Sequence, residues 1–258
     1  MTTEYFTSPE GRRLAYCKIP PANGGPTLIW LSGYRSDMSG GKAQAVKSWA
    51  WESGFGAVLF DYSGHGESEG RFEDGTISAW REDTLAAIDA LSEGPLILVG
   101  SSMGGWMALL GALARPERVK GLVLIAPAPD FTEKLMWAGL SQAQQEEVMT
   151  QGVTLRPSDY GTPDPITKAL IEDGRGWQIL DAPIAFDGPV RILQGMQDPD
   201  VPWPHALEIN ERLTSSDVVL TLIKDGDHRL SRDEDVARLL AACGDVAASI
   251  AGCNQRTA

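Results

Sequence analysis

The chain has 258 residues, of which 43% are hydrophobic and 22% charged, so it suits one large globular domain and is not intrinsically disordered. Acidic residues number 35 against 22 lysines and arginines, which gives a formal net charge of −13. A chain this acidic offers no basic surface for phosphates. We therefore expect neither nucleic acid nor an anionic membrane surface as a partner.

Short apolar runs alternate along the chain with longer amphipathic stretches. The turn-forming segment Ser8–Gly11 separates Tyr5–Phe6 from Leu14–Tyr16 and predicts an antiparallel hairpin at a sheet edge. The later runs are continuously hydrophobic, as expected of strands that are buried on both faces of a sheet. The strand candidates are Leu14–Ile19, Thr27–Leu31, Ala57–Phe60, Leu96–Gly100, Val119–Ile125, Val190–Gln194 and Val218–Ile223.

Four helix candidates lie between these strands: Gly41–Ser53, Thr76–Leu91, Met103–Ala114 and Arg232–Ala251. Alternation of strands and helices is typical of a parallel sheet that is covered by helices on both faces. We therefore predict an α/β fold with a mostly parallel central sheet.

One segment interrupts the alternation. Residues 130–188 contain no strand candidate, but they carry apolar residues with helical character and four prolines. We predict a small helical cap inserted after the sixth strand, with residues 1–129 and 189–258 forming the core. The alternative is a surface excursion without a function.

The candidate nucleophile is Ser102 in the motif Gly100-Ser101-Ser102-Met103-Gly104. This G-x-S-x-G sequence directly follows an apolar strand candidate and precedes a helix candidate. A serine on such a tight turn projects its hydroxyl from the sheet edge, and the glycines allow the turn to close. We therefore predict nucleophilic catalysis by Ser102.

A nucleophilic serine needs a general base, and the chain has three histidines. His228 lies in the loop after the last predicted strand, so we choose it as the base. His65 lies in a glycine-rich turn, and we expect a structural role for it. His205 stands at the start of a helix, where we expect an exposed or capping residue.

The carboxylate that orients the histidine should come from a loop between Ser102 and His228. Asp198 and Asp200 both follow the strand candidate Val190–Gln194. We favour Asp198, which is nearer the strand end, and keep Asp200 as the alternative. The order serine, aspartate, histidine is the order found in α/β hydrolases.

The oxyanion hole needs two preorganised hydrogen-bond donors. We expect the backbone N–H of Met103, which follows the nucleophile, to be one of them. The loop after Thr27–Leu31 should supply the other, and we choose the N–H of Tyr34, with Gly33 permitting the turn.

The substrate class is less determined. Five residues are candidates to line an apolar acyl pocket: Met103, Trp106, Met136, Trp137 and Leu140. Trp106 and most of the others equally suit packing within the helix and the cap. Arg35 and Arg229 flank the predicted site loops and are candidates to receive a carboxylate such as a glucuronate. The substrate is then a small molecule or an acylated protein.

The sequence predicts no cofactor and no metal site. Cys17, Cys243 and Cys253 lack the short spacing of zinc ligands, and the glycine-rich segments match neither a phosphate-binding loop nor a dinucleotide fingerprint. The longest apolar run, Leu122–Ala128, is too short to span a membrane, so we expect no stable membrane insertion. The oligomeric state is not indicated.

Taken together, these motifs resemble the α/β-hydrolase superfamily. The similarity is stronger to a family of animal mitochondrial palmitoyl-protein thioesterases and acyl-glucuronide esterases, and it implies the same triad of Ser102, Asp198 and His228. It extends over roughly Leu28 to Ala251 and is weakest in the cap. The segments that carry it are Phe60–Gly64, Gly94–Trp106, Ala114–Val119, Val201–Trp203 and Asp227–Arg229.

The resemblance has one departure, because no Arg- and Ser-rich transit peptide or secretory signal stands before the domain. We therefore expect a cytoplasmic enzyme of bacterial type that hydrolyses esters or thioesters. The same triad also serves carbon–carbon bond hydrolases and perhydrolases, and some α/β-hydrolase folds are ligand receptors without catalysis. These remain alternatives.

Overall fold

The computed structural model describes residues 3–22, 25–156 and 163–254. Within these ranges, eight strands form one central sheet in the order β1-β2-β4-β3-β5-β6-β9-β10. Strands β1, β2 and β4 pair antiparallel, and the remaining pairs are parallel. The sequence prediction of a mostly parallel sheet with an antiparallel edge hairpin is confirmed. The strands are β1 (Glu4–Thr7), β2 (Arg13–Ile19), β3 (Thr27–Leu31), β4 (Gly56–Phe60), β5 (Leu96–Ser101), β6 (Val119–Ile125), β9 (Val190–Gly195) and β10 (Val218–Ile223).

The central strands are apolar throughout because both of their faces are buried. In β3, Ile29 and Leu31 belong to one core cluster, whereas Leu28 and Trp30 belong to the other. Side chains alternate between the faces of a strand, so a continuous hydrophobic run supplies both layers at once. The positions of these strands could therefore be predicted from continuous hydrophobic runs in the sequence.

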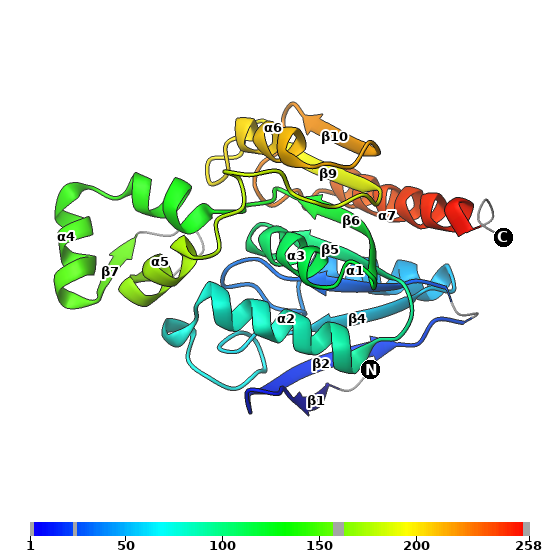
Figure 1. Cartoon of the computed structure of the whole chain (residues 1–258), viewed down its shortest axis with the longest axis horizontal. Helices are drawn as coiled ribbons and strands as arrows, with labels where there is room; N and C mark the ends of the chain where they lie inside the picture. Colours follow the sequence, from blue (N-terminus) through cyan, green and yellow to red (C-terminus); the bar gives the residue numbers. More distant parts are fainter. Residues whose placement is uncertain (1–2, 23–24, 157–162, 255–258) are drawn as a thin grey trace.

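Helices cover the two faces of the sheet (Figure 1). Helices α1 (Gly41–Glu52) and α7 (Asp233–Asn254) contribute to the core on one face. Helices α2 (Ile77–Leu91), α3 (Met103–Ala114) and α6 (Trp203–Arg212) contribute to the core on the other. A short 3-10 helix, η1 (Phe72–Asp74), precedes α2. This three-layer arrangement is that of the α/β-hydrolase fold.

The segment between β6 and β9 projects from one end of the sheet (Figure 1). It contains the π-helical η2 (Thr132–Trp137), α4 (Gln142–Gln151), β7 (Val153–Arg156), β8 (Asp164–Thr167) and α5 (Lys168–Arg175). Strands β7 and β8 pair antiparallel as a separate small sheet.

The expectation of a segment without strands was therefore wrong. Strands β7 and β8 have four residues each, β7 is largely exposed, and β8 contains Pro165, so neither shows a strand pattern in the sequence. The division into a core (residues 1–129 and 189–258) and a cap (130–188) stays a prediction.

None of the helices in the described ranges is long and apolar enough to cross a membrane.

Candidate active site

Ser102 occupies a strained turn between β5 and α3. Its backbone has φ 55° and ψ −119°, a left-handed conformation that is unfavourable for a residue with a side chain. The turn is held by three backbone hydrogen bonds. Ser102 N–H donates to the Ile125 carbonyl (2.8 Å), and the Ser102 carbonyl accepts from the N–H groups of Gly105 (2.9 Å) and Ala128 (3.1 Å). These contacts fix the serine at the carboxyl edge of the parallel strands.

Close backbone approach explains the glycine that follows the serine in the motif. A Cβ at Gly104 would lie 1.9 Å from the Leu31 carbonyl oxygen, so helix α3 can begin this close to β3 only without a side chain there. Gly33 approaches from the loop after β3, where a Cβ would lie 3.3 Å from Ser102 Cβ. The loop chosen for the second oxyanion donor therefore lies directly against the serine.

Ser102, His228 and Asp198 form a continuous chain of hydrogen bonds. His228 Nε2 lies 3.1 Å from Ser102 Oγ, and His228 Nδ1 lies 2.8 Å from Asp198 Oδ2. The three residues come from the loops after β5, β10 and β9. A carboxylate on Nδ1 selects the tautomer in which Nε2 is free to accept a proton from the serine.

Asp198 is held rigidly in this position. Its Oδ1 accepts the backbone N–H groups of Asp200 (2.9 Å) and Val201 (2.8 Å), and its Oδ2 also accepts from the Gln194 amide (3.1 Å). The structure thus brings Asp198 into contact with His228, whereas Asp200 supports Asp198 through its backbone.

A cavity of about 690 Å³ opens at Ser102. Among the predicted site residues, Gly33, Tyr34, Arg35, Met103, Met136 and Arg229 line it. Its apolar wall includes Phe131 and Leu135, which precede Met136 in the segment after β6. The cavity therefore joins the candidate nucleophile to an apolar region, as ligand pockets commonly do.

Three of the predicted pocket residues, Trp106, Trp137 and Leu140, are not among the residues that line this cavity. Trp106 is fully buried and its ring meets the edge of Phe131 at a centroid distance of 5.7 Å. The Arg175 guanidinium lies over the Trp137 ring, 5.1 Å from its centroid. Both tryptophans therefore pack within the structure, and their assignment to the pocket was wrong.

The two remaining histidines lie away from the relay. His65 is buried among aromatic rings, and burial lowers its pKa to about 4, in line with the expected structural role. His205 is also buried, and its Nε2 donates to the Pro129 carbonyl (2.9 Å). The expectation that His205 is exposed was wrong, because the first turn of α6 packs against the chain that follows β6.

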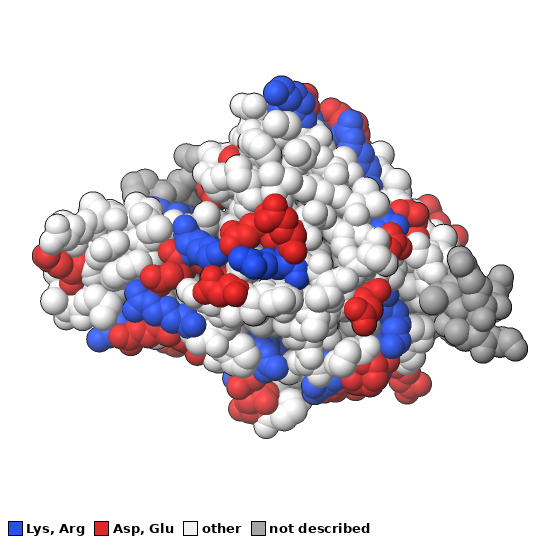
Figure 2. Space-filling view, turned by 45° about the horizontal axis from the view of Figure 1, so that its top comes forward, with Lys and Arg blue, Asp and Glu red and all other residues white. Residues whose placement is uncertain are grey.

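Charged side chains also line the cavity, and the sequence did not single out three of them: Lys42, Arg156 and Asp164. The described lining holds four basic residues and three aspartates, a different balance from the strongly acidic chain as a whole. The Lys42 ammonium donates to the Arg229 carbonyl, and burial lowers its pKa to about 8. No motif marks these positions, because they converge only through the fold. On the face in Figure 2, acidic and basic side chains are interspersed in the same way.

Asp198, Asp200 and His228 place three potential metal-ligand atoms within 4.8 Å of one another. Both oxygens of Asp198 and both ring nitrogens of His228 are engaged in the hydrogen bonds described above. The arrangement therefore suits proton transfer to and from Ser102 better than cation binding.

The fold and this arrangement of residues define the class of the protein, an α/β hydrolase. A family model described as serine aminopeptidase, S33, matches residues 27–165. Over 247 residues the chain is 36% identical to the mitochondrial palmitoyl-protein thioesterase ABHD10 of Rattus norvegicus, covering 95% of this chain and 82% of the rat protein.

Two solved structures are similar over nearly the whole chain. A putative hydrolase from Agrobacterium vitis S4 has a TM-score of 0.92 and 46% identity, with 95% of this chain and 98% of that chain covered. ABHD10 from mouse has a TM-score of 0.87 and 36% identity, with the same coverage. The chain belongs to the ABHD10 family of ester and thioester hydrolases within the α/β-hydrolase superfamily.

The comparisons contradict one expectation from the sequence. The ABHD10 relatives from rat, human and mouse are named as mitochondrial proteins, so the inference of a cytoplasmic enzyme was wrong. That inference depended on the lack of transit-peptide character in the first residues of the sequence, and this feature does not determine the location.

Proposed function

We propose that the chain hydrolyses acyl esters or thioesters through an acyl-enzyme on Ser102. Ser102 Oγ attacks the carbonyl carbon while His228 Nε2 takes the hydroxyl proton, and Asp198 stabilises the imidazolium that forms. His228 then gives this proton to the departing alcohol or thiol. A water molecule, activated by the same histidine, attacks the acyl-enzyme and releases the acid. The hydrogen-bond chain of 3.1 Å and 2.8 Å is the observation that carries this proposal.

The oxyanion of the tetrahedral intermediate is held, in this proposal, by the backbone N–H groups of Met103 and Tyr34. Met103 is the first residue of α3, where the helix dipole favours negative charge. Gly33 packs against Ser102, which supports the adjacent Tyr34 N–H as the second donor. Both residues line the cavity.

We propose an acyl thioester, including an S-acylated protein, as the substrate class. The ABHD10 relatives are named palmitoyl-protein thioesterases. The apolar wall formed by Phe131, Leu135 and Met136 provides a surface for an acyl chain beside Ser102.

A second candidate substrate is an acyl glucuronide, whose leaving group carries a carboxylate. The observation that favours it is the excess of basic residues in the described cavity lining, which includes Arg35 and Arg229. A carboxylate on the leaving group would be attracted to this part of the cavity. Comparison of an acyl glucuronide with its methyl ester tests this candidate, since methylation removes the charge.

Two further alternatives share the fold. Carbon–carbon bond hydrolysis or perhydrolysis would use the same triad, and assays with a 1,3-diketone or with peroxide distinguish them. A ligand receptor without catalysis does not need a hydrogen-bonded relay at a cavity, and labelling of Ser102 by a fluorophosphonate probe argues against it.

The deciding experiment is hydrolysis of matched oxygen esters and thioesters with acyl chains of two to sixteen carbons, with Ser102→Ala as the control. Preference for long-chain thioesters supports the thioesterase, whereas rapid cleavage of short esters without thioester preference indicates a general carboxylesterase. If Ser102→Ala retained more than a tenth of the activity, the nucleophile assignment would be wrong.

A further inference from the structure

We propose that the ion pair between Arg35 and Asp164 positions the oxyanion loop: by holding the turn Gly33–Ser36, it holds the Tyr34 N–H against the reacting carbonyl. Arg35 is then a positioning residue, not a residue that touches the substrate's reacting atoms. This inference rests on the proposed role of the Tyr34 N–H.

The turn after β3 has a strained residue at its centre. The Ser36 N–H donates to the Gly33 carbonyl (3.0 Å) and closes the turn. Within it, Arg35 has φ 56°, in the left-handed region that a residue with a Cβ seldom adopts. Such a conformation persists only where surrounding contacts hold it, so the contacts of Arg35 need to be considered.

The Arg35 side chain supplies these contacts. Its Nη1 donates to Asp164 Oδ1 (3.0 Å) and to the Pro163 carbonyl (2.9 Å) at the start of β8. Asp164 is only 6% exposed and also lies 3.7 Å from Arg156 of β7. The guanidinium further lies 5.3 Å from the centroid of the Phe72 ring. A charge-assisted bond to a buried carboxylate is strong and directional enough to hold the turn.

Tyr34 attaches to the same strand. Its hydroxyl donates to the Pro165 carbonyl (2.9 Å), and its ring meets the edges of Phe72 and Phe131 at centroid distances of 4.8 and 5.9 Å. Adjacent residues of the loop, Tyr34 and Arg35, are therefore both bonded to the first residues of β8. The small sheet after β6 thus contacts the oxyanion loop directly.

The opposite side of the turn leaves little free space. A Cβ at Gly33 would lie 3.3 Å from both the Ser101 carbonyl oxygen and Ser102 Cβ. If the turn shifts, the Tyr34 N–H therefore moves relative to the Ser102 hydroxyl. Because an oxyanion donor acts on charge that develops in the transition state, we expect the effect in kcat and not in KM.

The test uses the full-length enzyme and a short-chain oxygen ester, with Arg35→Ala, Arg35→Gly and Asp164→Asn. Arg35→Ala should lower kcat at least about tenfold, since it removes the ion pair and keeps the strained backbone. Arg35→Gly also removes the ion pair, but glycine adopts the left-handed conformation freely. It should therefore be about fivefold more active than Arg35→Ala.

Asp164→Asn keeps Arg35 and removes the carboxylate, so it should lower kcat in the same direction even if an Arg35 variant folds poorly. KM should change less than about threefold in all three. Arg115→Ala is the matched control, because Arg115 pairs with Asp89 (2.6 Å) at a site outside the cavity lining. It should leave kcat unchanged.

Two results would overturn the inference. Equal loss in Arg35→Ala and Arg35→Gly, expressed as a higher KM, would show that Arg35 binds substrate. Wild-type kcat in Arg35→Ala and Asp164→Asn would show that the ion pair does not position the loop. Activity in Ser102→Ala would instead refute the proposed function, so the two failures are distinguishable. As an independent readout, inhibition by a boronic acid, which forms a tetrahedral adduct on Ser102, should weaken in parallel with kcat.

Discussion

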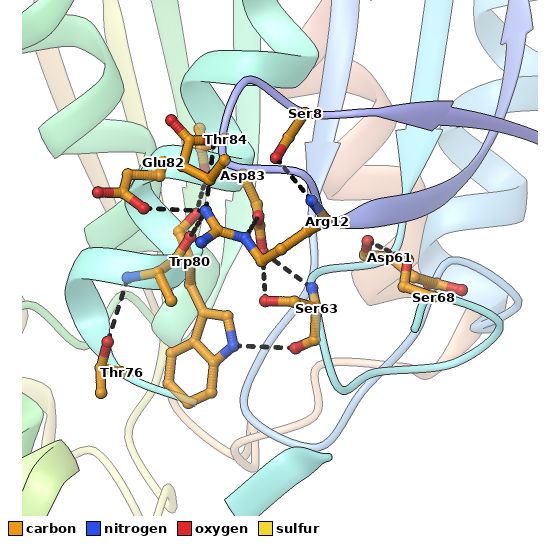
Figure 3. Close-up of polar contacts among 12 residues, drawn as sticks. Ser8, Arg12, Asp61, Ser63, Ser68, Thr76, Trp80, Glu82, Asp83 and Thr84 are labelled. Atoms are coloured by element: carbon orange, nitrogen blue, oxygen red, sulfur yellow. Dashed lines mark hydrogen bonds and ion pairs between the residues drawn. The ribbon is translucent and has the colours of Figure 1, made fainter. Parts of the chain in front are cut away.

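Arg12 and Asp83 form an ion pair that joins the turn between β1 and β2 to helix α2, with Arg12 Nε 2.7 Å from Asp83 Oδ1 (Figure 3). The Asp83 side chain is 0% exposed, and its other oxygen accepts the backbone N–H (2.8 Å) and hydroxyl (2.7 Å) of Ser63. Ser63 in turn accepts the Trp80 indole N–H on its carbonyl (3.2 Å). Although Arg12 and Ser63 both favour the carboxylate, burial is the larger effect and raises the pKa of Asp83.

Removal of Arg12 should therefore destabilise the protein. Arg12→Ala leaves the buried Asp83 carboxylate without its cation, and we expect a loss of about 2 to 3 kcal/mol in the free energy of unfolding. Arg12 is itself 26% exposed, which reduces the loss from that of a fully buried pair. Urea unfolding measures this quantity. Arg13→Ala is the control, because its pair with Glu69 is exposed and should contribute less than about 1 kcal/mol.

Acidification should destabilise the fold through His65. Its pKa is lowered to about 4 in the folded protein by burial, against 6.5 for an ordinary histidine. Between these values the unfolded chain binds a proton that the folded protein does not, so stability falls as the pH drops from 6.5 to 4. The contribution is about 3 kcal/mol at most.

The measurement compares wild type with His65→Phe in urea unfolding across this pH range. Phenylalanine suits the site, where the His65 ring meets the edges of Phe72 and Trp80 at centroid distances of 5.1 and 5.3 Å. The variant should show a shallower dependence of stability on pH. Identical slopes in the two proteins would contradict the prediction.

The predictability of each element follows from its burial. All seven predicted strands occur with at most one residue of difference. The central strands are buried on both faces, which gives a continuous apolar run that is independent of the neighbouring elements. Helix α3 occurs with the predicted bounds for a similar reason. The edge strand β10 is only partly buried, and its β-branched residues mark it instead. By contrast, β7 and β8 have four residues each and pair only with each other, and their residues carry no comparable pattern.

The residues of the candidate site also differ in how well the sequence predicts them. Ser102, Asp198 and His228 follow strand ends that the sequence reveals, so the topology alone brings them to one sheet edge. The lining from the segment after β6 depends on how that segment folds back. This is why the sequence did not single out Arg156 and Asp164, which reach the cavity only through that folding.

Gly104 should tolerate no side chain. In Gly104→Ala the new Cβ would lie 1.9 Å from the Leu31 carbonyl oxygen, which belongs to the buried backbone of β3 and cannot move aside. We expect destabilisation of at least about 3 kcal/mol, or failure to fold. Gly139→Ala is the matched control, because it is also helical and its Cβ would meet nothing within 4 Å. Thermal unfolding of the two variants checks this, and comparable melting temperatures would refute it.

The apolar wall should control acyl length. Met136 lines the cavity and is only 4% exposed, so Met136→Trp places a larger ring in the space proposed for the acyl chain. The ratio of kcat/KM for a sixteen-carbon ester to that for a two-carbon ester should fall about tenfold or more. Met149→Trp, at a residue of α4 that is 39% exposed and outside the cavity lining, should leave this ratio unchanged. An unaltered ratio in Met136→Trp would place the acyl chain elsewhere.

The two aspartates after β9 give the sharpest test of the relay, since the same substitution should have very different effects at each. Asp198→Asn presents an amide to His228 Nδ1 and favours the wrong tautomer, so kcat should fall by about 10⁴. Asp200→Asn keeps the backbone N–H that donates to Asp198 Oδ1 (2.9 Å) and should cost less than about tenfold. The pre-steady-state acylation rate with a chromogenic ester measures both effects, and circular dichroism checks that each variant is folded. The reverse ranking would make Asp200 the orienting carboxylate, whereas comparable small losses would exclude both from the relay.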